Sequence, residues 1–377
     1  MENVLSIITF KRECLSVTFS LSYIISFPLS MAGSAAFLPR VLLFSVFDDI
    51  IRIQISSEYQ NRRIIMRVRF HLPDFSGSFK LNLLFAEMLK NRPDFFREGV
   101  EIASVYGVFP PCLWNGGRSQ GGNTDKNYMK TVIREFNNRG IPLRFTFTNI
   151  MLEKKHLSDE RCNMMLHLAN NGMNEVIVAS PILEDYIRKE FPQYKLTSST
   201  CKRLNTKEAL MAELEKDYHV VVADYDLNNK FDILEDLPRK KDIELLVNAC
   251  CQPECQGRLQ HYKDISQQQI AFCNHIKKYP NVPFDLEKYD PNHFSACPYS
   301  KRSIFDIKEL KTHISPEAIW EKYVPMGFEQ FKIEGRTAST LNKVETYMYY
   351  MAKPELREEA RYFLLGMMED SGALIFT

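Results

Sequence analysis

Eight short runs of apolar, often β-branched residues constrain the fold of this 377-residue chain most strongly, because amphipathic segments of helical length separate most of them. That alternation is typical of βαβ units and a parallel sheet. The predicted strands are Val68–Leu72, Val100–Val108, Leu143–Thr148, Glu175–Ala179, Lys195–Ser199, His219–Asp224, Ile243–Asn248 and Gln330–Glu334. The predicted helices include Lys80–Lys90, Lys126–Arg139, Asp159–Asn171, Pro181–Glu190 and Thr206–Lys216. Eight strands favour an α/β fold with a closed (β/α)8 TIM-barrel-like domain over an open doubly wound sheet.

The charge balance limits the class of partner. Lys and Arg number 48 against 47 Asp and Glu, which leaves a net charge of +1. With so small a net charge, the protein as a whole does not attract nucleic acid electrostatically, so binding of an RNA substrate would need a local basic patch. Nine cysteines in a chain of this length are too sparse for a small secreted disulfide scaffold, and a reducing, cytoplasmic location is predicted.

The first 65 residues differ from the rest. Leu15–Leu29 is apolar and Ser-rich, and the small-residue run Met31–Ala36 follows it, which is the layout of a signal peptide. Pro28 interrupts the run and disfavours a transmembrane helix. The alternative is that translation starts at Met66, just before the first predicted strand. Residues 1–65 are therefore an uncertain extension, which is upstream translation, a signal or anchor, or a true domain, and they do not enter the fold prediction.

A long insert precedes the last predicted strand. Residues 250–325 exceed an ordinary βα connection, carry most of the cysteines and contain a Gln-rich predicted helix, Ile265–Lys278. The predicted organisation is a barrel over 66–354 that includes this insert, followed by a C-terminal helical tail at 355–377. We expect no membrane contact for residues 66–377.

A glycine-rich loop follows the second predicted strand and holds the first candidate site residues. Four glycines there, with Asn115 and Arg118, would let backbone amides approach an anion while Arg118 donates as a fork. The loop matches neither the P-loop nor the Rossmann spacing, so it is not a nucleotide motif. Asn115 and Arg118 are predicted substrate-binding residues, with a plain turn-rich loop as the alternative.

Two other predicted strands end in polar residues. In Thr197–Lys202, Ser199 is predicted to line a polar cavity and Cys201 is a candidate nucleophile, although capping is the commoner use of such hydroxyls. Asp224–Asp226 offers carboxylates for contacts, or forms a solvated turn.

The last predicted strand carries the candidate catalytic residues. Alternation along a strand places Lys332 and Glu334 on one face and Phe331 and Ile333 on the other. Charges on an inward barrel face are costly unless they are paired. We predict that Lys332 and Glu334 point into the barrel mouth with Arg336 at its rim. The alternative is a surface strand with solvated charges.

The clustered cysteines predict a metal centre. Cys251, Cys255, Cys273 and Cys297 give four thiolates on the insert, which suits an iron–sulfur cluster or structural zinc. Cys250 could replace Cys251 as the first ligand. Buried thiols without a metal are the alternative.

Three stretches together resemble a known family. Leu-Leu-Val-Asn248 with the following cysteines and His261-Tyr262, the string Phe-Lys-Ile-Glu-Gly-Arg336, and Asn174–Pro181 are similar to the collagenase-like peptidases of family U32, whose catalytic type is unknown. The resemblance covers Met66 to Pro354.

The resemblance implies a barrel-like domain and, in many members, a 4Fe-4S cluster, here with Cys251, Cys255, Cys273 and Cys297 as ligands. Well-studied relatives support oxygen-independent hydroxylation in quinone biosynthesis or of RNA bases. The sequence thus predicts a cluster-dependent hydroxylase for RNA or a small aromatic precursor, with Asn248 as a further substrate-binding residue. The alternatives are a peptidase, and a non-catalytic cluster-bearing partner in a hetero-oligomer with a related protein.

Hydrolase chemistry has little support in the residues. The chain lacks an HExxH zinc motif and a nucleophile elbow. A Cys201 nucleophile paired with His219 or His261 stays open at this point.

Overall fold

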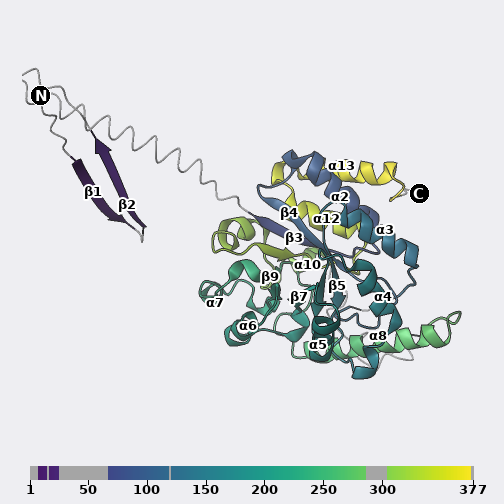
Figure 1. The fold of residues 1–377 in the computed structure, drawn as a ribbon. Helices are drawn as coiled ribbons and strands as arrows, with labels where there is room; N and C mark the ends of the chain where they lie inside the picture. Colours follow the sequence, from purple (N-terminus) through teal and green to yellow (C-terminus); the bar gives the residue numbers. More distant parts are fainter. Residues whose placement is uncertain (1–6, 15–16, 25–66, 119, 286–303, 375–377) are drawn as a thin grey trace, which may run out of the picture. The chain divides into compact units, whose positions relative to one another are not determined.

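The computed structural model describes residues 7–14, 17–24, 67–118, 120–285 and 304–374. The chain divides into two compact units, Met1–Ile64 and Ile65–Thr377. In the first unit, β1 (Ile7–Cys14) and β2 (Val17–Ile24) pair as an antiparallel hairpin, an arrangement that the sequence did not lead us to expect (Figure 1). The signal-like segment beyond residue 24 lies outside the described residues. Among the helices described, none combines the length and apolar character needed to cross a bilayer.

Eight parallel strands of the second unit close into a barrel in the order β10-β3-β4-β5-β6-β7-β8-β9 (Figure 1). They are β3 (Val68–Pro73), β4 (Val100–Gly107), β5 (Leu143–Phe147), β6 (Glu175–Val178), β7 (Lys195–Ser198), β8 (Val220–Val222), β9 (Ile243–Leu246) and β10 (Gln330–Lys332). Each lies within or beside its predicted segment, so the predicted (β/α)8 fold is confirmed. Closure depends on β10, in which Phe331 is opposite Phe70 of β3 and Leu245 of β9.

Helices of the same unit connect and cover the strands. The α-helices are α2 (Phe79–Asn91), α3 (Lys126–Asn137), α4 (Glu160–Ala169), α5 (Pro181–Glu190), α6 (Lys207–Leu214), α7 (Phe231–Leu234), α8 (Arg258–Lys278), α10 (Ile304–Ile307), α11 (Pro316–Ala318), α12 (Thr340–Met351) and α13 (Arg357–Asp370). The 3₁₀ turns are η1 (Pro93–Phe95), η2 (Lys154–His156), η3 (Thr200–Lys202), η4 (Tyr225–Leu227), η5 (Lys240–Asp242) and η7 (Pro354–Leu356), and η6 (Ile319–Tyr323) is a π-helix. Helix α8 begins earlier than the predicted start at Ile265.

Local signals in the sequence fix several helix starts. The carboxylate of Asp125 accepts hydrogen bonds from the backbone N–H groups of Asn127 and Tyr128, which caps α3. Asp159 caps α4 by accepting from the N–H of Cys162. Pro181 occupies the first turn of α5, where its missing N–H costs nothing.

The apolar core lies between the outer face of the barrel and the helices. The ring of Phe70 lies 6.0 Å from that of Phe331 and 6.4 Å from that of Tyr350 on α12, measured between centroids. Each fully buried side chain of this kind stabilises the fold by about 1.5–3 kcal/mol. Polar residues occupy several of the inward positions, together with apolar ones such as Ile177 and Val222.

The barrel interior is charged, whereas such barrels are ordinarily filled by layers of branched apolar side chains. The buried guanidinium of Arg144 on β5 pairs with Glu244 on β9, and its Nε lies 3.3 Å from Oε2 of Glu175 on β6. Lys332 Nζ lies 3.1 Å from Oε1 of Glu244. Charges this deep are tolerated because each has a partner of opposite sign.

A polar cavity of about 240 Å³ opens at the amino ends of the strands. Arg69, His71, Glu175 and His219 are among the residues that line it. His219 Nδ1 lies 3.2 Å from Oε1 of Glu175, so the charged interior reaches this face. His219 therefore belongs to the end of the barrel opposite the candidate site described next.

Candidate functional site at the barrel mouth

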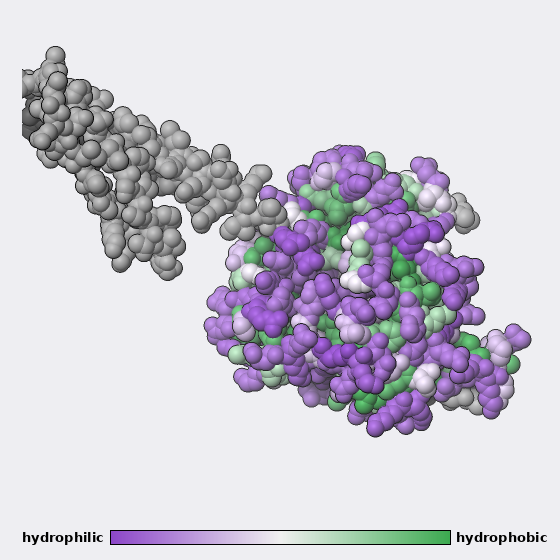
Figure 2. All heavy atoms as spheres, in the orientation of Figure 1, coloured by the Kyte–Doolittle hydropathy of each residue, from purple (hydrophilic) through white to green (hydrophobic). Residues whose placement is uncertain are grey.

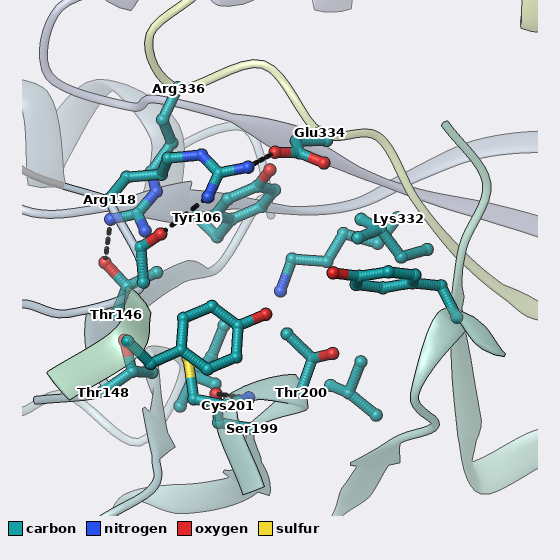
Figure 3. A pocket seen from close by; sticks show the side chains of 16 residues that line it. Tyr106, Arg118, Thr146, Thr148, Ser199, Thr200, Cys201, Lys332, Glu334 and Arg336 are labelled. Atoms are coloured by element: carbon teal, nitrogen blue, oxygen red, sulfur yellow. Dashed lines mark hydrogen bonds and ion pairs between the residues drawn. The ribbon is translucent and has the colours of Figure 1, made fainter. Parts of the chain in front are cut away.

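A second cavity lies at the carboxyl ends of the strands, where the chemistry of such barrels gathers. Its volume is about 80 Å³, several times what one water molecule needs. Tyr106 from β4, Thr146 from β5 and Lys332 from β10 line it (Figure 3). Leu246 from β9 lines it as well. Residues far apart in the sequence therefore meet at one polar opening.

Arg118 and Glu334 form an ion pair at one side of this cavity (Figure 3). The second carboxylate oxygen of Glu334 accepts a hydrogen bond of 3.0 Å from the backbone N–H of Cys250. Burial acts to raise the pKa of Glu334, but the Arg118 charge and the Cys250 hydrogen bonds outweigh it and lower the pKa. The charge of Glu334 raises the pKa of Arg118. Both groups are therefore charged at neutral pH.

The side chain of Asn248 holds the backbone of Glu334 through two hydrogen bonds. Its Oδ1 accepts from the N–H of Glu334 at 2.6 Å, and its Nδ2 donates to the carbonyl oxygen of the same residue at 3.0 Å. Asn248, a predicted substrate-binding residue, thus holds the backbone of Glu334 just after β10.

Lys332 extends its ammonium toward the centre of the cavity (Figure 3). Nζ lies 4.3 Å from the centroid of the Tyr106 ring, a cation–π distance, and contacts Glu244 below it. Burial lowers the pKa of Lys332, and the negative charge of Glu244 opposes that shift only in part. Lys332 therefore releases its proton more readily than an exposed lysine does.

Within the described part of the chain, the hydrogen bonds of Arg336 all go to neutral acceptors. Its Nη1 donates to Asn115 Oδ1 and to Thr146 Oγ1, both at 2.8 Å, and its Nη2 donates to the carbonyl oxygen of Gly116 at 2.9 Å. Burial lowers the pKa of Arg336, and the nearby Arg118 adds to the effect. Asn115, a predicted substrate-binding residue, thus lies behind Arg336.

The glycines of the loop permit close approach of the chain. A Cβ on Gly116 would lie 2.4 Å from the carbonyl oxygen of Thr148. Gly117 has a φ of +71°, and a Cβ there would lie 3.2 Å from Cys201 Sγ. Only glycine lets the loop reach β5 and hold Arg118 over the cavity.

Ser199, predicted to line a polar cavity, and Cys201, the candidate nucleophile, both line this cavity. Ser199 Oγ accepts from the N–H of Cys201 at 3.1 Å, which is a cap of η3. Burial raises the pKa of the Cys201 thiol. The suggested pairing of Cys201 with His219 is wrong, because His219 contacts Glu175 at the opposite face.

Asp224 and Asp226 bind the insert to the barrel. Arg258, the first residue of α8, donates to Asp224 Oδ1 at 2.8 Å and to Asp226 Oδ1 at 3.0 Å. Its guanidinium carbon lies 4.0 Å from the centroid of the Tyr225 ring. The two aspartates are therefore neither a solvated turn nor lining residues of the cavity.

Helix α8 contributes directly to the site. Its Tyr262 lines the cavity, and its Gln269 Oε1 accepts from Asn115 Nδ2 at 3.3 Å and from the N–H of Gln120 at 3.1 Å. Sequence reasoning missed Tyr262, Tyr106 and Thr146. A polar residue near the carboxyl end of an otherwise apolar predicted strand was the available signal for the last two.

The cysteines of the insert occupy different surroundings. Cys251 packs beside Tyr225 and Ala249, whereas Cys273 Sγ lies 3.7 Å from Gln269 Nε2 on α8. Cys297 lies outside the described residues. Within the part of the chain that is described, no three His, Cys, Asp or Glu side chains are placed to hold a metal ion. Because one of its four predicted ligands is not described, the cluster stays a prediction.

The search of solved structures found a similar chain. The solved structure of the U32 peptidase Mk0906 is similar over 72% of this chain and 94% of that chain, with 13% identity and a TM-score of 0.43. This is the family named from the sequence. No protein-family model matches the chain, and no curated protein matches it either.

Proposed function

We propose that this protein is an enzyme that acts on a small molecule at the barrel mouth, with Lys332 and Glu334 as its acid–base residues. The observation that carries the proposal is the position of Lys332, whose buried ammonium points into the cavity and has a lowered pKa. Shifted ionisable groups in a cleft favour a functional site over a structural one. The carboxyl end of a barrel is where such groups act.

The two residues suit opposite roles in proton transfer. With a lowered pKa, Lys332 can give a proton to a substrate oxygen or, as the free amine, accept one. Glu334 is ionised and can accept a proton from substrate. Tyr106, whose ring lies against Nζ, limits where that ammonium can go.

The size of the cavity favours a small substrate over a polypeptide or RNA. The structural relative is named a peptidase. A cysteine peptidase mechanism here would need a reactive thiolate, and the raised pKa of Cys201 disfavours that form. Peptidase activity stays an alternative, to be tested with casein and gelatin.

The cluster, oxygen-independent hydroxylation, a hetero-oligomeric partner and a cytoplasmic location stay predictions of the sequence and the family resemblance. Because the described cysteines do not converge, no step of the proposed chemistry runs through a cluster. Iron and acid-labile sulfide measured after anaerobic purification test the cluster independently. If it forms, Cys255→Ser and Cys297→Ser each lower the iron content, whereas Cys162→Ser does not.

The enzyme proposal is tested with a mixture of metabolites. Wild-type protein and the variants Lys332→Ala and Glu334→Gln are incubated with a small-molecule extract, and mass spectrometry follows every component over time. We expect at least one compound to be consumed by the wild type and by neither variant. Identical profiles for the wild type and both variants, all three folded by circular dichroism, would contradict an enzymatic role for these residues.

A further inference from the structure

We infer that the substrate carries a single carboxylate group and that this group binds the guanidinium of Arg336. The inference rests on the proposed function for the place where substrate binds. It goes beyond that function by naming the charge and the chemical group of the ligand.

The first argument is a charge count of the barrel interior and mouth. The cations are Arg118, Arg144, Lys332 and Arg336, and the carboxylates are Glu175, Glu244 and Glu334. His71 does not alter the count near neutral pH, because burial lowers its pKa to about 3. One positive charge is therefore in excess.

That excess charge is located at Arg336. Arg118 pairs with Glu334, and Lys332 pairs with Glu244. Across the described residues, Arg336 takes part in no ion pair. Asp74, the acidic residue whose charge reaches Arg336 through space, is itself 3.2 Å from the ammonium of Lys343.

The second argument is the way in which Arg336 is held. A guanidinium has five N–H donors, and three hydrogen bonds to an amide, a hydroxyl and a carbonyl oxygen leave two of them. Nε is one of the remaining donors, since it has no acceptor in the described part of the chain. Neutral acceptors fix the orientation of the group without cancelling its charge. A partly buried cation of this kind is stabilised by an anion that enters the cavity.

The third argument selects a carboxylate over a phosphate. One negative charge balances the count, whereas a phosphate dianion would exceed it. A planar carboxylate also matches the fork of a guanidinium. The same cavity already contains a pair of an arginine and a carboxylate, because Arg118 donates to the carboxylate of Glu334. A volume of about 80 Å³ suits a compact acid.

The test measures binding of simple anions to the full chain at constant ionic strength. Acetate, propionate and pyruvate are the monocarboxylate probes, with acetamide and propionamide as neutral analogues and inorganic phosphate as the dianion. Ligand-detected NMR and thermal unfolding give the dissociation constants. We expect at least one monocarboxylate to bind at least tenfold more tightly than its amide and than phosphate.

Variants assign that binding to Arg336. Arg336→Gln should weaken monocarboxylate binding at least tenfold, whereas Arg134→Gln, an exposed arginine on α3, should leave it unchanged. Arg336→Lys keeps the charge without the fork and should give an intermediate affinity, which provides a readout if the glutamine variant does not fold. Equal affinity in folded Arg336→Gln and wild type, tighter binding of phosphate, or no monocarboxylate binding at millimolar concentration would overturn the inference.

The two proposals fail in different ways. Arg336-dependent binding of carboxylates without turnover of any acid would leave the inference in place and remove the enzymatic function. Lys332-dependent turnover of an uncharged compound would support the enzymatic function and contradict the inference of a carboxylate substrate.

Discussion

The ammonium of Lys332 lies 3.1 Å from Oε1 of Glu244, and Oε2 of the same carboxylate contacts both Arg144 and His71. Burial acts to raise the pKa of Glu244, but Arg144, Lys332 and His71 outweigh it, so the pKa is far below its usual range. One carboxylate thus connects the candidate active site with the barrel interior.

Replacing Glu244 by Gln should destabilise the barrel strongly. The change leaves Arg144 and Lys332 facing a neutral amide in a buried place, and loss of one partner of a buried pair costs about 3–5 kcal/mol. The free energy of unfolding in urea measures the effect. As a control, Glu190→Gln removes an exposed partner of Lys189 and should change stability by less than about 0.5 kcal/mol.

The double variant Glu244→Gln/Lys332→Met gives a sharper measurement of the same pair. Removing both charges should cost less than the sum of the two single changes, because residues in contact do not act additively. Additivity within about 0.5 kcal/mol would contradict coupling between Glu244 and Lys332.

Acid should weaken the fold in part through His71. Burial lowers its pKa to about 3 from an ordinary 6.5, with further lowering by Arg144 and Lys332. Below pH 6.5, His71 is protonated in the unfolded chain but stays neutral in the folded chain. The free energy of unfolding therefore decreases as the pH is lowered, by up to about 1.4 kcal/mol per pH unit, until the pKa of folded His71 is reached. Urea unfolding between pH 7 and pH 3 should give a smaller slope for His71→Asn than for the wild type.

His313→Asn is the matched control for that slope. Burial lowers the pKa of His313 to about 4, so its contribution is complete at a higher pH than that of His71. The two variants should therefore differ from each other in the most acidic part of the range. A His71→Asn slope identical to that of the wild type would argue that His71 is protonated in the folded barrel.

Replacing Arg258 by Met should loosen the insert before the barrel. The change takes from the buried Asp224 and Asp226 the nearer of their cations, and the start of α8 loses its attachment. Hydrogen exchange should rise first in residues 249–278. Arg203→Gln is the control, since Arg203 lies 3.7 Å from the same aspartates and should have a smaller effect. Unchanged exchange in α8 would show that the attachment is dispensable.

Three thiols with raised pKa values should react slowly in the native protein. Burial raises the pKa of Cys250 and of Cys273 to about 12, and raises that of Cys201. Little thiolate is present near neutral pH, so alkylation by iodoacetamide should be slow until the protein is unfolded in urea. Peptide mass spectrometry over time gives the rate for each cysteine. Native Cys201 that reacts as fast as in urea would revive the cysteine hydrolase alternative.

The strands were predictable because their apolar character is local. Runs such as Glu175–Ala179 and His219–Asp224 are read directly from neighbouring residues, and each proved to contain a strand. The pairing of β10 with β3, which closes the barrel, could not be predicted from neighbouring residues, because most of the chain separates the two strands. The start of α8 was missed for a similar reason: Arg258 looks like a loop residue until its partners Asp224 and Asp226 are known.

The site was predictable where it follows strand ends. Arg118, Lys332, Glu334 and Arg336 all came from loops or strand ends and all lie at one cavity. The partner Glu244 was not found, since nothing local shows that its side chain points inward toward Lys332.

Asn115 presents its side-chain oxygen to Arg336 and its nitrogen to Gln269 and to the carbonyl of Arg118. Conversion of that amide to a carboxylate would place a negative charge against Arg336, where we infer that the substrate carboxylate binds. The next residue is Gly116, and asparagine followed by glycine is the pair most prone to spontaneous deamidation. Deamidation of Asn115 should therefore reduce carboxylate binding at Arg336, although it removes no residue from the cavity.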